Sequence, residues 1–327
     1  MPRQARLDIP GALHHIMVRG INRSAIFRDN QDRARFLERL GETVSAAQGS
    51  IYAWVLMKNH VHILFKSGGE GVSAVMRRLL TWYAQYFNRR HKRSGHLFEN
   101  RYKSILCEEE TYLLALVRYI HLNPIRARIL KSVEELDRYR WSGHRAIIGK
   151  ATCPWMDIDT VLMRYGGRRE NAIRAYRRFV EEGMAEGRNP VLVGGGLIRS
   201  QGGWSEVVAL RRRGQDEESD ERILGSGDFV HRVLQEAEER HLRQIKLCRA
   251  GSSISHIIQE ECERRGVSSE ELQRGGRRAR VSKARAAIAY RSKEELGLSG
   301  AEIARHLGVN TSSINRAIAR AERGEDT

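Results

Sequence analysis

A predicted hairpin constrains the fold of this chain more than any other stretch. Residues 51–57 (IYAWVLM) are rich in β-forming side chains, and a Lys-Asn pair can turn the chain into a second run, HVHILFK, at residues 60–66. In a strand, successive side chains point to opposite faces. His60 and His62 would therefore share one face of the second strand, while apolar side chains occupy the other face.

Strand and helix signals alternate around this hairpin. The other predicted elements are a strand at residues 13–20, helices at 29–49, 73–91 and 108–124, and an extended stretch at 96–107. We expect the last helix to stop near Pro124, because proline lacks the backbone N–H that continues a helix. This order favours a small α+β domain, an antiparallel sheet covered by helices.

The rest of the chain is predicted to be mostly helical. We expect three parts: a domain at residues 1–147, a helical extension and linker at 148–250, and a helix-turn-helix unit at 251–327. Residues 188–204 are rich in glycine, which is typical of a linker or an extended arm.

The charge of the chain favours a polyanionic partner. The sequence has 57 Lys and Arg against 40 Asp and Glu, a net charge of +17 and a pI near 10.2. Nucleic acid is the leading candidate. An anionic membrane surface is the rival, but no basic amphipathic helix with an exposed aromatic face stands out. No apolar run approaches about 18 residues, the N-terminus lacks an apolar signal core, and the four cysteines are far apart. We expect a cytoplasmic protein with no membrane partner.

Two imidazoles on one strand face can converge on one metal ion. The Cα atoms of His60 and His62 would lie about 6.6 Å apart, at roughly 3.3 Å per residue. A pair of this kind is also compatible with a structural role, so the pair alone does not establish a metal site.

A second pair of residues strengthens the metal hypothesis. Tyr119 and Asn123 are four residues apart, which places them on one face of a helix. Asparagine offers a carbonyl oxygen suited to Mg²⁺ or Mn²⁺, and a tyrosine phenolate can attack phosphorus. Each residue also has a structural interpretation, Tyr119 as a core aromatic and Asn123 as a helix terminator before Pro124.

Four segments carry a family resemblance. They are PGALHHIMVRGINRSAIF (10–27), WVLMKNHVHILF (54–65), GHLFENRYKS (95–104) and YIHLNPIRARI (119–129). Together they resemble the single-tyrosine HUH transposases and, within them, the REP-associated tyrosine transposases. The resemblance implies a ferredoxin-like sheet in which His60, His62 and Asn123 hold Mg²⁺ or Mn²⁺. It also implies Tyr119 as the nucleophile.

The same resemblance implies a reaction and a substrate. Tyr119 would cleave single-stranded DNA at hairpin-forming, REP-type repeats, giving a 5′-phosphotyrosine link and a free 3′-OH. The attack of another 3′-OH would rejoin strands. By residue type alone there are four rival nucleophiles, which stand outside the family motif: Tyr83, Tyr86, Tyr102 and Tyr112. The resemblance leaves monomer and homodimer open.

Basic and aromatic side chains are interleaved in the first hundred residues, as single-strand binding requires. The cations are Arg19, Arg23, Arg77, Arg78, Arg89, Arg90, Lys92, Arg93, Arg101 and Lys103. The rings are Trp82, Tyr83, Phe98 and Tyr102.

Residues 298–322 predict a helix-turn-helix. Gly308 permits the turn, and Asn310 or Thr311 caps the second helix. Residues 251–323 resemble the DNA-binding domain of the bacterial replication initiator DnaA, although NTSSI stands here where the initiator has DHTTV. We expect this unit to bind duplex DNA. The predicted DNA contacts are Arg277, Arg278, Arg280, Thr311, Ser312, Ser313, Asn315 and Arg316.

Two other functions remain open at this point. A non-enzymatic DNA-binding regulator could keep the HUH fold as a scaffold, but the four candidate site residues argue against it. An HUH replication or conjugation initiator usually carries a third histidine, paired tyrosines or a helicase, and we recognise no helicase segment in this sequence. A further alternative for the C-terminal unit is a structural module of three packed helices that does not bind DNA.

Overall fold

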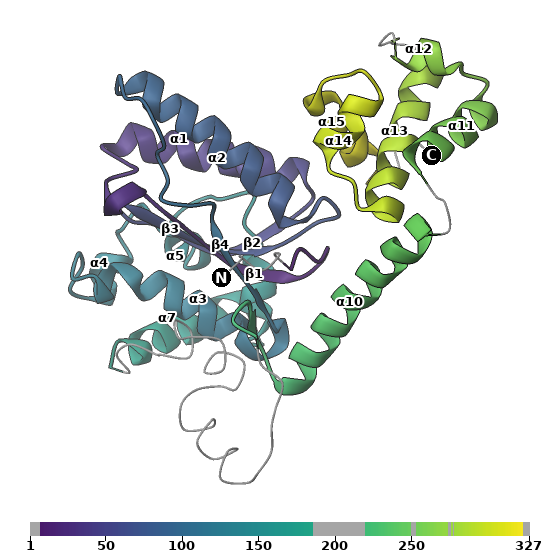
Figure 1. Cartoon of the computed structure of the whole chain (residues 1–327). Helices are drawn as coiled ribbons and strands as arrows, with labels where there is room; N and C mark the ends of the chain where they lie inside the picture. Colours follow the sequence, from purple (N-terminus) through teal and green to yellow (C-terminus); the bar gives the residue numbers. More distant parts are fainter. Residues whose placement is uncertain (1–6, 186–219, 250–252, 274–275, 277, 323–327) are drawn as a thin grey trace. The chain divides into compact units, whose positions relative to one another are not determined.

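The structure, a computed structural model, divides into two compact units, Met1–Arg232 and Val233–Thr327. It describes residues 7–185, 220–249, 253–273, 276 and 278–322 (Figure 1). Each unit has its own cluster of buried apolar side chains. The glycine-rich stretch at residues 188–204 lies outside the described residues.

A mainly antiparallel sheet forms the centre of the N-terminal unit. Its strands are β1 (Leu13–Arg19), β2 (Ser50–Leu56), β3 (His60–Lys66), β4 (Lys103–Cys107) and β5 (Ile223–Leu224). They lie in the order β2-β3-β1-β4-β5, with the first four antiparallel and β5 parallel to β4. The predicted α+β, ferredoxin-like fold is confirmed. The short edge strand β5 was not predicted, because two residues carry no periodicity.

Helices cover both faces of this sheet. On one face lie α1 (Asn30–Ala46) and α2 (Gly71–Arg90), and on the other lies α3 (Glu109–Arg126), with α7 (Arg169–Ala185) packed on α3 (Figure 1). The shorter helices are η1 (Ile21–Arg23), α4 (Val133–Leu136), α5 (His144–Ile147) and α6 (Ile158–Met163). In the predicted extended stretch at 96–107, only β4 and a single bridge from Phe98 to Gly20 are strand-like.

The core of the N-terminal unit extends beyond residue 147. Val161, Leu162, Tyr176 and Val180 are buried in the same apolar cluster as the sheet. Helices α6 and α7 thus complete this unit in space. The boundary at residue 147 stays a prediction about where the family-like domain ends.

The C-terminal unit contains the predicted helix-turn-helix. Its helices are α11 (Ile254–Arg265), α12 (Ser269–Gln273), α13 (Ala279–Leu296), α14 (Gly300–His306) and α15 (Thr311–Glu322), preceded by α10 (Gly227–Arg249). Ser299 and Glu302 form a capping box at the start of α14, and Gly308 makes the turn at φ +64°. The Oδ1 atom of Asn310 accepts from the Ser313 N–H at 2.7 Å, so Asn310 is the cap of α15.

Two general features of the described residues bear on location. None of their helices combines the length and apolar character that crossing a membrane requires. Cys107, Cys153 and Cys262 are free thiols. The cytoplasmic location stays a prediction.

One buried histidine makes the N-terminal unit sensitive to acid. His14 on β1 is fully buried, with Nδ1 3.1 Å from the Ser104 hydroxyl. Burial lowers its pKa from 6.5 to about 4, and attraction by Asp8 offsets only part of this effect. Because the folded state binds this proton less tightly than the unfolded chain, the free energy of unfolding decreases as the pH falls from 6.5 towards 4.

We predict that His14→Gln, which removes this titration, reduces the loss of stability between pH 7 and pH 5. The expected difference is on the order of 2 kcal/mol. Thermal denaturation of both proteins across this pH range measures it. The same pH slope in the variant and in the wild type would contradict the assignment.

Candidate active site

The structure brings the predicted histidines and the predicted tyrosine together. His60 and His62 lie on one face of β3 with ring centroids 5.2 Å apart. The ring of Tyr119, from α3, lies 6.0 Å from that of His62. Asn123 follows Tyr119 by one helical turn, and its Nδ2 atom donates to the Tyr119 carbonyl at 3.0 Å. The strand and the helix thus bring the two imidazoles and the Tyr119 ring together, and Asn123 lies one turn further along the same helix.

The side chain of Asn123 is held at the point where Pro124 interrupts the backbone hydrogen bonds of α3. The helix continues through Pro124 to Arg126, so the predicted stop at Pro124 was wrong. Proline cannot donate to the carbonyl four residues earlier, that of Ile120. The Nδ2 atom of Asn123 reaches this carbonyl at 3.4 Å as well as that of Tyr119. With Nδ2 held by backbone oxygens, Oδ1 is the atom that Asn123 can offer to a ligand.

Both histidines form a hydrogen bond through Nδ1, and that of His60 fixes the position of its proton. The Nδ1 atom of His60 lies 2.8 Å from Oδ1 of Asn59, whose Nδ2 donates to the Arg23 carbonyl. Nδ1 of His60 is therefore the donor, and Nε2 keeps a lone pair. The Nδ1 atom of His62 lies 2.9 Å from Nε2 of His15. If His62 Nδ1 donates in that contact, its Nε2 is also free to bind a metal.

Burial keeps both imidazoles uncharged near neutral pH. Desolvation, reinforced by the positive charge of Arg19, lowers the pKa of His60 to about 4. The pKa of His62 lies well below 6.5, mainly through desolvation and then through its histidine neighbours. A neutral imidazole is the form that binds a metal ion.

His15 is a residue of the site that the sequence analysis missed. It lies on β1, is buried, and its ring is stacked with that of His62 at 5.2 Å and 5.8 Å from the ring of Tyr119. The alternation of side chains along a strand could have indicated His15. His15 lies on the same face of β1 as Met17, and Met17 stands opposite His62 in the pairing of β1 with β3. That register, however, becomes visible only when β1 and β3 are paired.

Two arginines place positive charge around the site. The Arg126 guanidinium lies 5.1 Å from the centre of the Tyr119 ring, and its Nη1 atom donates to the Tyr119 carbonyl at 3.4 Å. Arg19 stands opposite His60 in the β1–β3 pairing and is exposed. A phosphate group beside Tyr119 would thus meet a favourable potential.

Two contacts, one near the start of α3 and one near its middle, hold this helix against the sheet and against α7. Near its start, Glu109 pairs with Lys66, the last residue of β3, at 2.8 Å. Further along, Gly183 of α7 lets the helices approach closely, since a Cβ atom there would lie 2.5 Å from Cδ of Arg118. The helix that carries Tyr119 is therefore fixed at two points.

A buried polar chain joins α3 to α5 and α7. The Tyr176 hydroxyl lies 2.7 Å from Nδ1 of His121 and 2.8 Å from Nδ1 of His144, whose Nε2 lies 2.9 Å from an Asp137 oxygen. Burial lowers the pKa of His121 well below 6.5 and lowers that of His144, although Asp137 partly counters the second shift. This polar chain thus links two neutral imidazoles through the phenol of Tyr176. One of the imidazoles, that of His121, lies two residues after Tyr119 on α3.

The predicted DNA contacts of the C-terminal unit fall into three groups. Arg280, Ser312 and Arg316 are exposed, and Thr311 and Ser313 are half-buried at the start of α15. Arg278 is exposed but pairs with Glu271 at 3.2 Å, and Asn315 approaches Gly300 of α14 so closely that a Cβ there would lie 2.4 Å from its Oδ1. Arg277 lies outside the described residues. Asn315 thus packs against α14, and its contact with DNA stays a prediction.

Comparison with known proteins assigns the N-terminal domain. The family described as "Transposase IS200 like" matches residues 10–123, which contain every candidate catalytic and metal-binding residue. This is an IS200-like transposase domain. The family described as "Homeodomain-like domain" matches residues 279–327, so the IS200-like domain is followed by a helix-turn-helix domain of that type. The narrower likeness to the initiator DnaA stays a prediction.

One solved structure also resembles the chain. It is a REP-associated tyrosine transposase bound to a REP hairpin, with a TM-score of 0.39 and 18% sequence identity, covering 48% of this chain and 93% of the other. No curated protein matches the chain.

The candidate donor set of the IS200-like domain would leave open positions on a bound divalent cation. The described residues contain no cluster of three or more His, Cys, Asp or Glu side chains arranged as a metal site. The candidate set instead combines two neutral imidazoles with one amide oxygen. Such a set leaves coordination positions for water and a phosphate oxygen, as Mg²⁺ and Mn²⁺ require.

We predict that Tyr176→Phe destabilises the IS200-like domain by about 1–3 kcal/mol, because His121 and His144 lose their shared buried partner. Urea unfolding followed by far-UV circular dichroism measures this effect. Tyr165→Phe is the matched control: its ring lies 6.1 Å from that of Tyr176, and its buried hydroxyl has no hydrogen-bond partner among the described residues. Equal losses in the two variants would contradict a role for the polar chain.

Proposed function

We propose that this chain is a metal-dependent endonuclease and strand transferase for single-stranded DNA, with Tyr119 as its nucleophile. The observation that carries the proposal is the meeting of β3 and α3. Two neutral imidazoles and a phenol lie close together there, and an oriented amide lies one helical turn beyond the phenol. The match to an IS200-like transposase family supports the same conclusion.

The roles of the side chains follow from the atoms that they offer. His60 and His62 would hold Mg²⁺ or Mn²⁺ through Nε2, together with Oδ1 of Asn123. When bound, the cation would polarise the scissile phosphate and stabilise charge on the leaving oxygen. His15 would keep Nδ1 of His62 as a donor, and Arg126 would add positive charge beside the phenol.

The chemical step is a transesterification. The Tyr119 oxygen loses its proton and forms a bond to phosphorus, and the bond from phosphorus to the 3′ oxygen breaks. The 3′ oxygen leaves with a proton, and the 5′ end stays on the enzyme as a phosphotyrosine. Attack by another 3′-OH reverses these steps and joins strands, so no separate energy source is needed.

The substrate and the second domain complete the proposal. The resemblance to REP-associated transposases favours hairpin-forming, REP-type repeats as the single-stranded substrate. The helix-turn-helix domain would anchor the enzyme on duplex DNA, with Ser312 and Arg316 exposed at the start of α15. Cleavage rates in Mg²⁺ and in Mn²⁺ would give the metal preference, and the mass of the protein in solution would distinguish a monomer from a homodimer.

We predict that the wild type cleaves labelled, hairpin-bearing single strands in Mg²⁺ or Mn²⁺ and is inactive in EDTA. Tyr119→Phe should slow cleavage at least about 1,000-fold, because the nucleophile is gone. Tyr112→Phe, a tyrosine on the same helix, is the control and should keep most of the activity. Denaturing gels measure the cleavage rates, and oligonucleotides from the genomic neighbourhood supply the substrate pool.

The opposite result has a defined meaning. If the wild type binds these oligonucleotides but cleaves none of them, the proposal of an enzyme fails. The chain would then be a DNA-binding regulator that keeps the transposase fold as a scaffold.

We also predict that removal of residues 251–327 separates the two DNA-binding activities. Duplex affinity at about 0.1 M salt should decrease at least roughly tenfold and lose much of its salt dependence, because the cations of this unit are removed. Cleavage of a short single strand should stay near the wild-type rate, since the active site lies wholly in the N-terminal unit. Electrophoretic mobility shifts and the gel assay measure the two properties. Loss of single-strand cleavage in the truncated chain would contradict this division.

A further inference from the structure

A pocket of about 740 Å³ lies between α2 and the segment that precedes β4. This volume is in the range of about 300–1,000 Å³ that is typical of ligand pockets. Met76, Leu80 and Leu97 give it a buried apolar lining. The rings of Phe98 and Tyr102 also line it. An apolar cavity with aromatic walls suits a flat, weakly polar group.

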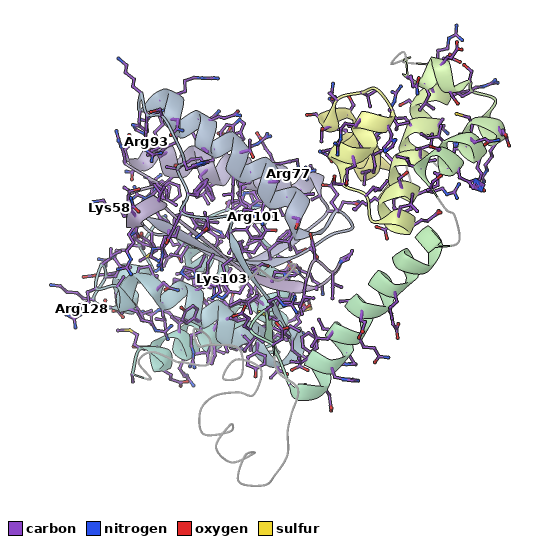
Figure 2. The ribbon with its side chains drawn as sticks, in the orientation of Figure 1. Lys58, Arg77, Arg93, Arg101, Lys103 and Arg128 are labelled. Atoms are coloured by element: carbon purple, nitrogen blue, oxygen red, sulfur yellow. The ribbon has the colours of Figure 1, made fainter. Side chains whose placement is uncertain are left out.

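The rim of this pocket is positively charged. Arg77 and Arg101 both line it and are exposed, and neither forms an ion pair with any residue that the structure describes (Figure 2). Other arginines of α2 are engaged in the fold: Arg78 pairs with Glu70, and Arg90 pairs with Asp29 at 2.7 Å. Glu99 is the acidic residue of the lining. The two rim guanidinium groups are therefore available to an anionic ligand.

Backbone pairing connects the pocket wall to the active site. The Leu97 carbonyl accepts from the Ile21 N–H at 3.0 Å, and the Glu99 N–H donates to the Arg19 carbonyl at 3.0 Å. Arg19 in turn stands opposite His60 in the pairing of β1 with β3. The pocket wall thus pairs with the end of β1, which lies between it and β3, the strand that carries His60.

We propose that this pocket takes one unstacked base of the single-stranded DNA substrate, while Arg77 and Arg101 contact its flanking phosphates. Rings that stack on a base, combined with cations that follow the backbone, are the general means of single-strand binding. A base in duplex DNA is paired and stacked, so a pocket of this kind selects a single strand. The inference rests on the proposed function and adds a subsite to it.

A charge-matched pair of variants tests the rim. The probe is a labelled dT12 oligonucleotide, and unlabelled duplex is added in excess to occupy the C-terminal unit. Arg77→Ala should weaken binding about fivefold or more, and Arg89→Ala about twofold or less, although both remove one exposed cation from α2. Fluorescence anisotropy with the full chain gives both affinities. Equal losses would overturn the subsite, because a general electrostatic effect would explain them.

Photocrosslinking tests the base itself. A dT12 strand with 5-iodo-deoxyuridine replacing thymidine at single positions should crosslink to Phe98 or Tyr102, as mapped by peptide mass spectrometry. Crosslinks confined to other segments would overturn the pocket even if Tyr119-dependent cleavage is normal. A wild type that neither binds nor cleaves single strands would instead overturn the proposed function, so the two failures can be distinguished.

Discussion

The site depends on one packing interaction, that of helix α3 on the imidazole face of strand β3. It places the ring of Tyr119 6.0 Å from that of His62. Both rings lie among the mostly apolar side chains that cover the sheet. Burial of polar rings at such a position destabilises the fold unless hydrogen bonds satisfy them. The contact from His62 to His15 and that from His60 to Asn59 meet this requirement at Nδ1 of each predicted ligand.

The rest of the N-terminal unit can be understood as support for that contact. The Lys66–Glu109 pair joins the end of β3 to the start of α3, and Gly183 allows α7 to lie close against it. The chain from His121 through Tyr176 to His144 ties α3 to elements beyond residue 130. The same contacts hold α5 and α7 against α3, so these helices belong to the N-terminal unit rather than to a separate extension. A tyrosine held in this way would lose little freedom on meeting a phosphate.

Much of this arrangement could be predicted from the sequence, because it depends on local periodicity. The alternation over HVHILFK predicted the strand and its histidine face, and the four-residue spacing of Tyr119 and Asn123 predicted their helix, whereas the chemistry of these residues stays a proposal. What escaped prediction depends on pairing between distant segments. His15 joins the site only through the register of β1 with β3, and β5 forms only because β4 offers it an edge. In the passage of α3 through Pro124, the side chain of Asn123 reaches the Ile120 carbonyl, which proline leaves without its usual donor.

The central claim is that Tyr119 forms a covalent bond with the 5′ end of a cleaved strand. The most direct test is to incubate the protein with Mn²⁺ or Mg²⁺ and hairpin-bearing single strands, digest the trapped adduct, and locate the modified peptide by mass spectrometry. We expect a nucleotide attached to Tyr119 in the wild type and no adduct in the His60→Ala variant. An adduct on Tyr83, Tyr86, Tyr102 or Tyr112, or cleavage that proceeds with no adduct at all, would contradict it.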